Sequence, residues 1–109
     1  MIRTVAGESR VPVIRTGEGV CHIYVDESAD LAMAKRILLN AKCSRPSVCN
    51  ACECVVVHRA IAPSFWAEAG PLLAERGVEL RCDKATQALV PQGIPASDED
   101  WDSEYGELI

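Results

Sequence analysis

Short apolar runs alternate along this chain with longer amphipathic stretches. Pro12 would place the first run near a sheet edge or at a strand start, because proline donates no backbone hydrogen bond. The third run is apolar throughout, which is typical of a strand buried on both faces. Four runs are rich in residues that favour strands: Val11–Ile14, His22–Val25, Cys54–His58 and Val78–Cys82.

A helical pattern follows the second run. Asp30 predicts the N-cap of a helix from Leu31 to about Lys42, because its carboxylate can accept an N–H group of the first turn. The residues spaced to form the buried stripe of this helix are Leu31, Ala34, Leu38 and Ala41. The sequence therefore predicts a strand followed directly by an amphipathic helix.

The second half of the chain repeats this order. A helical pattern spans Ile61–Arg76 and ends at Gly77, with a kink or a break expected at Pro71. Asp83 predicts a further short helix through Leu89. The alternation predicts a layered α/β fold, in which helices flank a largely parallel sheet. Three other segments are read as a helix end and two loops: Met1–Ser9, Thr16–Gly19 and Pro91–Pro95.

Composition narrows this picture. A chain of 109 residues is expected to form one domain. Aromatic residues make up only 5%, so we expect an aliphatic core of Val, Ile, Leu and Ala. No apolar run has the length of a membrane span and no signal peptide is seen, so a soluble, cytoplasmic protein is expected, without a membrane partner. In that compartment the six cysteines would be reduced thiols.

Charge is unevenly distributed. The net charge is -5, and six of the 16 acidic residues fall within the acidic C-terminal segment, residues 98–109. Residues 1–97 hold the other ten against all 11 Lys and Arg, a net charge of +1. The body of the chain has no basic stripe, which disfavours nucleic-acid binding. The acidic segment is most simply solvated, although its apolar residues suggest that part of it packs.

Cys49 is the residue best placed for chemistry. Pro46 marks a loop, and the residues after it can begin a helix. A thiol at such a junction would lie beside unpaired N–H groups and the positive end of the helix dipole, which favour the thiolate. The same N–H groups would stabilise an oxyanion after addition to a carbonyl. The alternative, that Cys49 is a small buried hydrophobic residue, stays open at this point.

The spacing of Cys49, Cys52 and Cys54, with His58 beyond them, raises a competing function. Such a cluster resembles half of a zinc site. Alternate side chains of a strand point to opposite faces, however, so these groups should not converge. Cys49 and Cys52 also form a C-x-x-C pair, but redox sites of that kind follow a strand, and this pair precedes one. A small Cys-rich zinc-binding or redox module is therefore the alternative hypothesis.

Several stretches together resemble a known family: Val11–Ile14, Gly19–Asp26, Ala29–Leu31, Asn40–Lys42, Arg45–Ala51, Val55–His58, Arg76–Leu80, Glu99–Trp101 and Glu104–Tyr105. The chain resembles the gamma-glutamyl phosphate reductases, also called glutamate-5-semialdehyde dehydrogenases. They belong to the aldehyde dehydrogenase superfamily and serve proline biosynthesis. The resemblance implies an oxidoreductase and a partial aldehyde-dehydrogenase-like catalytic domain.

The resemblance assigns roles to a few positions. Cys49 matches the catalytic thiol, which would displace phosphate from gamma-glutamyl phosphate to form a thioester. Hydride from NADPH would then reduce the thioester to glutamate-5-semialdehyde. The backbone N–H of Cys49 would be an oxyanion donor, while Arg45 and Asn50 would bind the small-molecule substrate. For Arg45, a solvent-facing or structurally paired side chain stays an equal alternative.

The chain also departs from the wider superfamily. Where many aldehyde dehydrogenases carry a glutamate that activates water, this sequence has Arg15, with Glu18 the nearest acid. That suits transfer to phosphate, since an activated water would hydrolyse the thioester. Family members are several hundred residues long and bind the nucleotide on a Rossmann domain, and no G-x-G-x-x-G pattern is present here.

These departures predict how the chain is organised. Residues 1–109 would form a single catalytic-domain fragment, with a nucleophile loop at 43–52. The NADPH site would lie mostly outside this chain, no metal would be bound, and the isolated chain would show no turnover. The full-length enzyme is expected to be a homo-oligomer.

Overall fold

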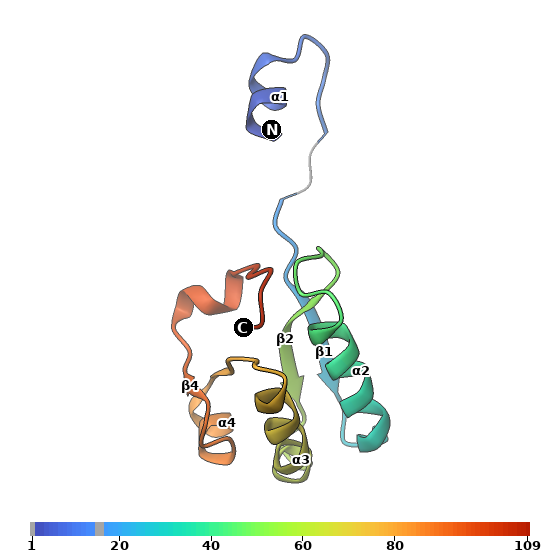
Figure 1. Cartoon of the computed structure of the whole chain (residues 1–109), viewed down its shortest axis with the longest axis vertical. Coiled ribbons are helices and arrows are strands. Elements are labelled where there is room, and N and C mark those ends of the chain that lie inside the picture. The colour runs from blue at the N-terminus through green and yellow to red at the C-terminus, as the bar shows by residue number, and fades with distance from the viewer. Residues whose placement is uncertain (1, 15–16) are drawn as a thin grey trace.

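The computed structural model describes residues 2–14 and 17–109, excluding the side chain of Ile2. Strands and helices alternate through the body of the molecule (Figure 1). The elements are α1 Ile2–Glu8, β1 Cys21–Val25, α2 Leu31–Cys43, β2 Cys52–Val57, α3 Ala62–Glu75, β3 Arg81–Cys82, α4 Lys84–Leu89, β4 Ile94–Pro95 and the 3₁₀-helix η1 Asp98–Asp102.

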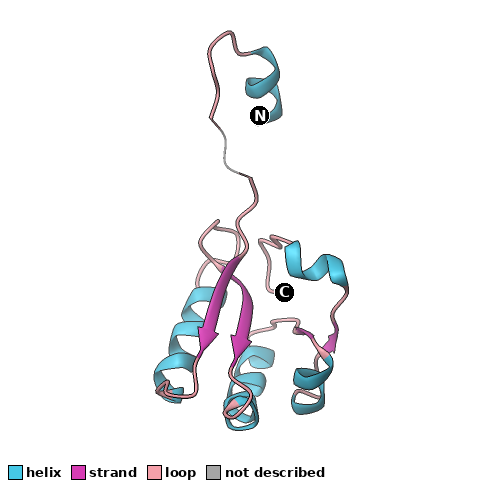
Figure 2. Ribbon diagram, turned by 180° about the vertical axis from the view of Figure 1, so that it is seen from behind, coloured by secondary structure: helices cyan, strands magenta, loops and turns pink. Residues whose placement is uncertain are grey.

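Both strand pairs are parallel, as the alternating pattern predicts. β1 pairs with β2 from Cys21↔Cys52 to Val25↔Val57, with an irregularity between Cys21 and His22. β3 pairs with β4 over two residues each. The layered α/β class is therefore confirmed, although the described strands form two separate two-stranded sheets rather than one (Figure 2).

Side-chain caps start two helices where the sequence predicts them. Asp30 Oδ1 accepts the N–H of Met33 at 2.8 Å, and Asp83 Oδ1 accepts the N–H of Thr86 at 2.8 Å. Each bond satisfies one of the N–H groups that a first helical turn leaves unpaired. The predicted stripe of α2 is also confirmed, because Leu38 is buried and its three neighbours on that face pack against the core.

α3 differs from expectation at Pro71. The helix continues past this residue to Glu75, so a break at Pro71 does not occur. Ala69 and Leu73, on either side of Pro71, are both 2% exposed, and their packing holds the two halves of the helix in place. Gly77 ends the helix as predicted, with a φ of 75° that favours glycine.

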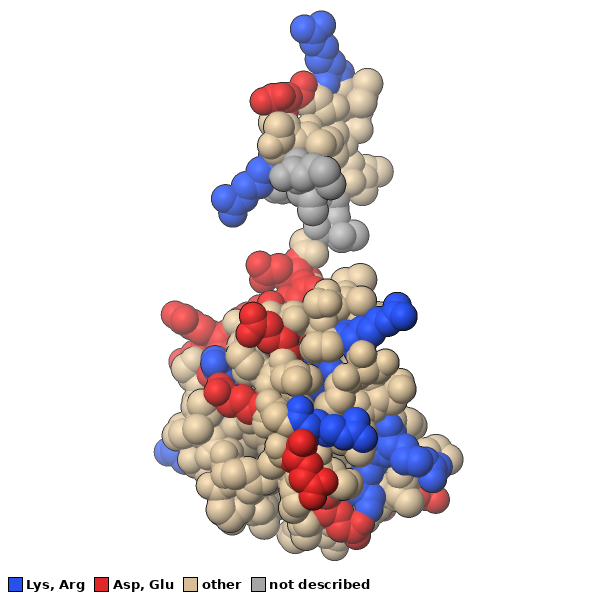
Figure 3. All heavy atoms as spheres, in the orientation of Figure 1, with Lys and Arg blue, Asp and Glu red and all other residues tan. Residues whose placement is uncertain are grey.

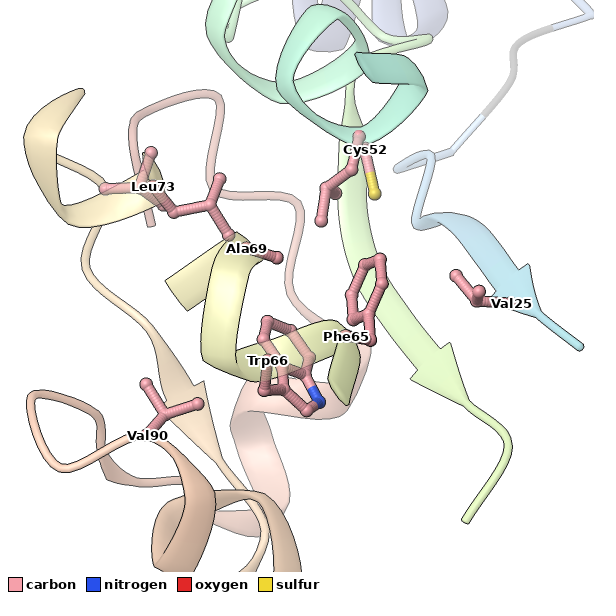
Figure 4. Close-up of a cluster of buried hydrophobic side chains, with 9 residues drawn as sticks. Val25, Cys52, Phe65, Trp66, Ala69, Leu73 and Val90 are labelled. Atoms are coloured by element: carbon pink, nitrogen blue, oxygen red, sulfur yellow. The ribbon is translucent and has the colours of Figure 1, made fainter. Parts of the chain in front are cut away.

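The core is mostly aliphatic, as predicted, and it also holds an aromatic pair that was not expected. Phe65 is 0% and Trp66 5% exposed, and their rings meet edge to face with centroids 5.2 Å apart. Both project from α3 into a cluster that includes Val25 from β1 and Val90 from the end of α4 (Figure 4). The low aromatic content therefore predicts the main composition of the core but not the central position of these two rings.

The N-terminal segment is the largest departure. Residues 11–14 form no strand and pair with nothing in the described part of the chain, and Ile14 is 100% exposed. They lie apart from the body of the molecule, together with α1 (Figure 1). The presence of α1 agrees with the helical segment predicted at the start of the chain. Residues that favour a strand form one only where the edge of another strand is available for pairing. The expectations for Met1, Arg15 and Thr16 fall outside the described residues.

Two predicted boundaries also shift near β3. The strand expected over residues 78–82 is reduced to Arg81–Cys82, and Ile94–Pro95, expected as loop, pairs with it. The N–H of Ile94 donates to Leu80 O at 2.8 Å. Gly93 permits this approach, since a Cβ there would lie 2.6 Å from Cys82 Sγ.

The acidic C-terminal segment is tied to the body by Asp100. Its carboxylate accepts the hydroxyl of Tyr105 at 2.6 Å, the N–H of Ser97 at 2.7 Å and Nη1 of Arg81 at 2.5 Å. The Tyr105 hydroxyl, the Ser97 N–H and Arg81, in that order, hold the pKa of Asp100 well below its ordinary value. Part of this segment therefore packs, as its apolar residues suggest.

We expect Asp100 to make folding sensitive to acid. Its pKa is lower in the folded chain than in the unfolded one, so its stabilisation is complete above about pH 4 and is lost as the pH falls further. In thermal unfolding, Asp100→Asn should lower the Tm clearly more at about pH 6 than at about pH 2, because part of the stabilisation is already lost at the lower pH. Asp102→Asn, at an exposed neighbouring site, is the control. Equal Tm losses at both pH values would contradict the assignment.

The surface carries charges of both signs. On the face drawn in Figure 3, basic side chains gather on the side where α2 lies, with acidic side chains between them. None of the described helices combines the length and the apolar character that crossing a membrane requires.

Candidate active-site turn around Cys49

Cys49 lies in a tight turn between α2 and β2. The N–H of Val48 donates to Arg45 O at 3.4 Å and that of Ala51 to Val48 O at 2.9 Å, after which β2 begins at Cys52. The helix expected after Pro46 is therefore wrong, and with it the helix-dipole argument. The apolar run that follows pairs with β1 instead, because β-branched residues favour a strand.

The turn nevertheless leaves backbone donors open. Cys49 is exposed, and among the described residues no acceptor takes the N–H of Cys49 or of Asn50. An unpaired N–H beside a nucleophile is the type of group that stabilises an oxyanion. The predicted donor, the N–H of Cys49, is thus available from a turn rather than from a helix.

The segment that leads into β1 meets the turn at the Cys49 carbonyl oxygen. Cys21 Sγ donates to this oxygen at 3.4 Å, and a Cβ added to Gly19 would lie 3.1 Å from it. The N–H of Gly19 in turn donates to Glu104 Oε2 at 2.7 Å. The site therefore combines the turn, the approach to β1 and the C-terminal segment. Sequence reasoning missed these three contacts, because each joins residues far apart in the chain.

The predicted substrate-binding residues share the same turn region. Arg45 and Asn50 are exposed, and no carboxylate of the described residues lies within ion-pair distance of the Arg45 guanidinium. Arg45 is thus solvent-facing and free to meet an anion. Glu18 is exposed as well, while Arg15 lies outside the described residues.

A buried ion pair closes the base of the turn. Lys42, near the end of α2, and Glu53, near the start of β2, meet with Nζ 3.0 Å from Oε2. Their side chains are only 5% and 2% exposed. Since the two residues flank the turn in sequence, this contact fixes both of its ends. The burial of Lys42 was not foreseen from the sequence.

Comparisons with known proteins bear on the whole chain. A scan of protein-family models found no match. Gamma-glutamyl phosphate reductase from Carboxydothermus hydrogenoformans is 51% identical over 109 residues, all of this chain and 26% of that protein. The corresponding reductase from Lactiplantibacillus plantarum is 50% identical over the same span and share.

A solved structure agrees with the sequences. The crystal structure of gamma-glutamyl phosphate reductase from Thermotoga maritima matches 99% of this chain with a TM-score of 0.90 and 45% identity. The chain is related over its whole length to the gamma-glutamyl phosphate reductases. It spans about a quarter of the length of these relatives, 26% in each case.

The remaining cysteines do not form a competing site. Cys52 is buried in the core, and burial raises the pKa of its thiol to about 11. Burial likewise raises the pKa of Cys54 and of Cys82. All six cysteines are free thiols. Among the described residues no group of three His, Cys, Asp or Glu side chains is arranged to hold a metal ion.

The different burial of the six cysteines predicts the order in which their thiols react. Near neutral pH, iodoacetamide should modify the exposed Cys49 first and the buried Cys52 and Cys82 last, because only an accessible thiolate reacts. Peptide mass spectrometry over a time course measures the order. Modification of Cys52 at the rate of Cys49 would show that the described packing is not maintained.

A cavity of about 530 Å³ lies beside β2. It is lined by residues 53–57 of β2 together with His22 of β1, by residues 79–83 and by parts of the C-terminal segment. Cys49 does not line it. The exposed thiol of Cys49 therefore lies outside the lining of this cavity.

Proposed function

We propose that this chain is part of the catalytic domain of a gamma-glutamyl phosphate reductase, with Cys49 as its acyl-carrying nucleophile. The observation that carries the proposal is the relation to these reductases over all 109 residues, which includes the turn. The exposed thiol beside two open backbone N–H groups supports it. The reaction would serve proline biosynthesis.

The residues of the turn account for the first half of the reaction. The Cys49 thiolate attacks the acyl carbon of gamma-glutamyl phosphate, and the negative charge moves to the former carbonyl oxygen. The N–H groups of Cys49 and Asn50 donate to this oxygen. Its collapse expels phosphate with the electron pair of the broken C–O bond and leaves a thioester on Cys49. Arg45 binds the departing phosphate or the substrate carboxylate.

The second half of the reaction needs a hydride donor, which we assign to NADPH. The first strand-to-helix turn of the described chain, residues 26–30, contains no glycine and carries Asp26 and Asp30. It does not fit the phosphates of a dinucleotide, which require a glycine-rich turn at a helix N-terminus. The cofactor is therefore bound mostly by residues outside this chain. The reduced thioester collapses to glutamate-5-semialdehyde and restores the thiolate of Cys49.

Phosphate dependence tests this function most sharply. A polypeptide that contains this chain together with the rest of the reductase should oxidise glutamate-5-semialdehyde with NADP⁺ only when inorganic phosphate is present. Phosphate is required because it must take the acyl group from Cys49. A water-activating dehydrogenase would proceed without it, and such phosphate-independent turnover would contradict the proposal. The 109-residue chain alone, as the matched comparison, should show no turnover.

A further inference from the structure

The carbonyl oxygen of Cys49 is the point where the turn contacts β1. The turn and the chain leading into β1 lie side by side at one end of the strand pair (Figure 2). There the Cys21 thiol donates to Cys49 O at 3.4 Å. Cys21 opens β1, and its backbone is held by pairing with Cys52 at the start of β2. The thiol is therefore presented from a fixed element, not from a loop.

We propose that Cys21 is a positioning residue for the nucleophile, an inference that rests on the proposed function of Cys49. A trans peptide is planar, and its C=O and N–H point in opposite directions. When Cys21 holds the Cys49 carbonyl toward β1, the N–H of Asn50 in the same peptide must point away from β1. Cys21 thus keeps this N–H turned outward, where a substrate oxyanion can meet it.

Gly19 and Glu104 support the same peptide. A Cβ at Gly19 would lie 3.1 Å from Cys49 O, so any larger residue would press on the carbonyl that Cys21 holds. Glu104 keeps Gly19 in place by accepting its N–H at 2.7 Å. The contact between Gly19 and Glu104 brings the C-terminal segment to the turn. Gly106 is close to the turn as well, since a Cβ there would lie 3.9 Å from the Cα of Ser47. The approach to β1 therefore restricts this peptide unit directly, and the C-terminal segment does so through Gly19.

The test compares acylation with alkylation of Cys49 in a polypeptide that contains this chain and the rest of the reductase. Acetyl phosphate transfers an acyl group through an oxyanion, whereas iodoacetamide reacts by direct displacement and forms none. Cys21→Ala should slow acetylation of Cys49 about fivefold to tenfold, the effect of losing one hydrogen bond. Cys21→Ser keeps a donor and should restore the rate to within about twofold of the original. Alkylation of Cys49 by iodoacetamide should keep its rate in both variants, because that reaction uses no oxyanion donor.

Controls separate this role from a general loss of structure. Cys54→Ala removes a half-buried thiol from the neighbouring strand and should leave acetylation of Cys49 unchanged. Gly19→Ala presses on the Cys49 carbonyl from outside any strand and should slow acetylation even if Cys21→Ala fails to fold. Thermal unfolding of each variant shows that the compared chains are folded.

The outcomes distinguish the two proposals. Equal acetylation of Cys49 in the original chain, Cys21→Ala and Gly19→Ala would overturn the positioning role and leave the proposed function standing. If the original chain takes no acetyl group on Cys49, the proposed function fails. Slowing of alkylation in parallel with acetylation in Cys21→Ala would also overturn the positioning role, because it would show a general change at the thiol rather than the loss of an oxyanion donor.

Discussion

Replacing Cys49 by serine should abolish reductase turnover. The substitution keeps the size and the exposed position of the side chain but replaces the thiolate by a hydroxyl, which is almost fully protonated at neutral pH and has no described base beside it. Loss of a nucleophile in comparable enzymes reduces kcat by about 10⁴-fold or more. The measurement is NADPH oxidation with gamma-glutamyl phosphate, in a polypeptide that contains this chain and the rest of the reductase.

The matched control for this prediction is Cys43→Ser. Cys43 ends α2 just before the turn and is half-buried, so its replacement tests the general effect of a hydroxyl in the same region. It should retain most of the turnover. A Cys49→Ser variant with a kcat within about tenfold of the original enzyme would rule out Cys49 as the nucleophile.

Breaking the ion pair at the base of the turn should have the largest effect on stability. Lys42→Met leaves the Glu53 carboxylate, whose side chain is 2% exposed, buried without its partner. An uncompensated buried charge of this kind typically costs about 3–5 kcal/mol of the free energy of unfolding. Urea unfolding followed by circular dichroism measures the loss. The variant should also disorder the Cys49 turn, because Lys42 and Glu53 hold its two ends.

Two further variants separate the buried charge from other effects. Lys42→Met combined with Glu53→Leu removes both charges and should recover most of the lost stability, since a well-packed apolar pair can replace a buried ion pair. Lys35→Ala breaks the pair with Glu68, whose side chain is 63% exposed, and should change the free energy of unfolding by at most about 1 kcal/mol. A loss below about 1 kcal/mol for Lys42→Met would contradict the structural role assigned to this pair.

The fold could be predicted where local chemistry determines it. Asp30 and Asp83 start helices through hydrogen bonds within their own first turns, and Gly77 ends one through its own φ. The predictions fail where the structure of a segment depends on pairing with residues far away in the sequence. Residues 11–14 have a strand composition but no described partner, and Ile94 becomes a strand only because Leu80 accepts its N–H.

The sequence proposes Cys49 as the central residue of the candidate site but does not predict the contacts around it. Cys49 follows from its place after Pro46 and from the family resemblance, although the expected helix after it is a turn and a strand. Glu104 is 85 residues from Gly19 in sequence, and Cys21 is 28 residues from Cys49. No periodicity or motif links such positions, so their contacts appear only in the folded chain.

The most direct test of the central claim is to trap the acyl group itself. A polypeptide that contains this chain and the rest of the reductase is mixed with gamma-glutamyl phosphate in the absence of NADPH, quenched in acid and digested for mass spectrometry. We predict one gamma-glutamyl group, attached to the peptide that carries Cys49 and released by hydroxylamine as a thioester is. A glutamyl group on another residue, or none on a preparation that turns over when NADPH is added, would contradict the account.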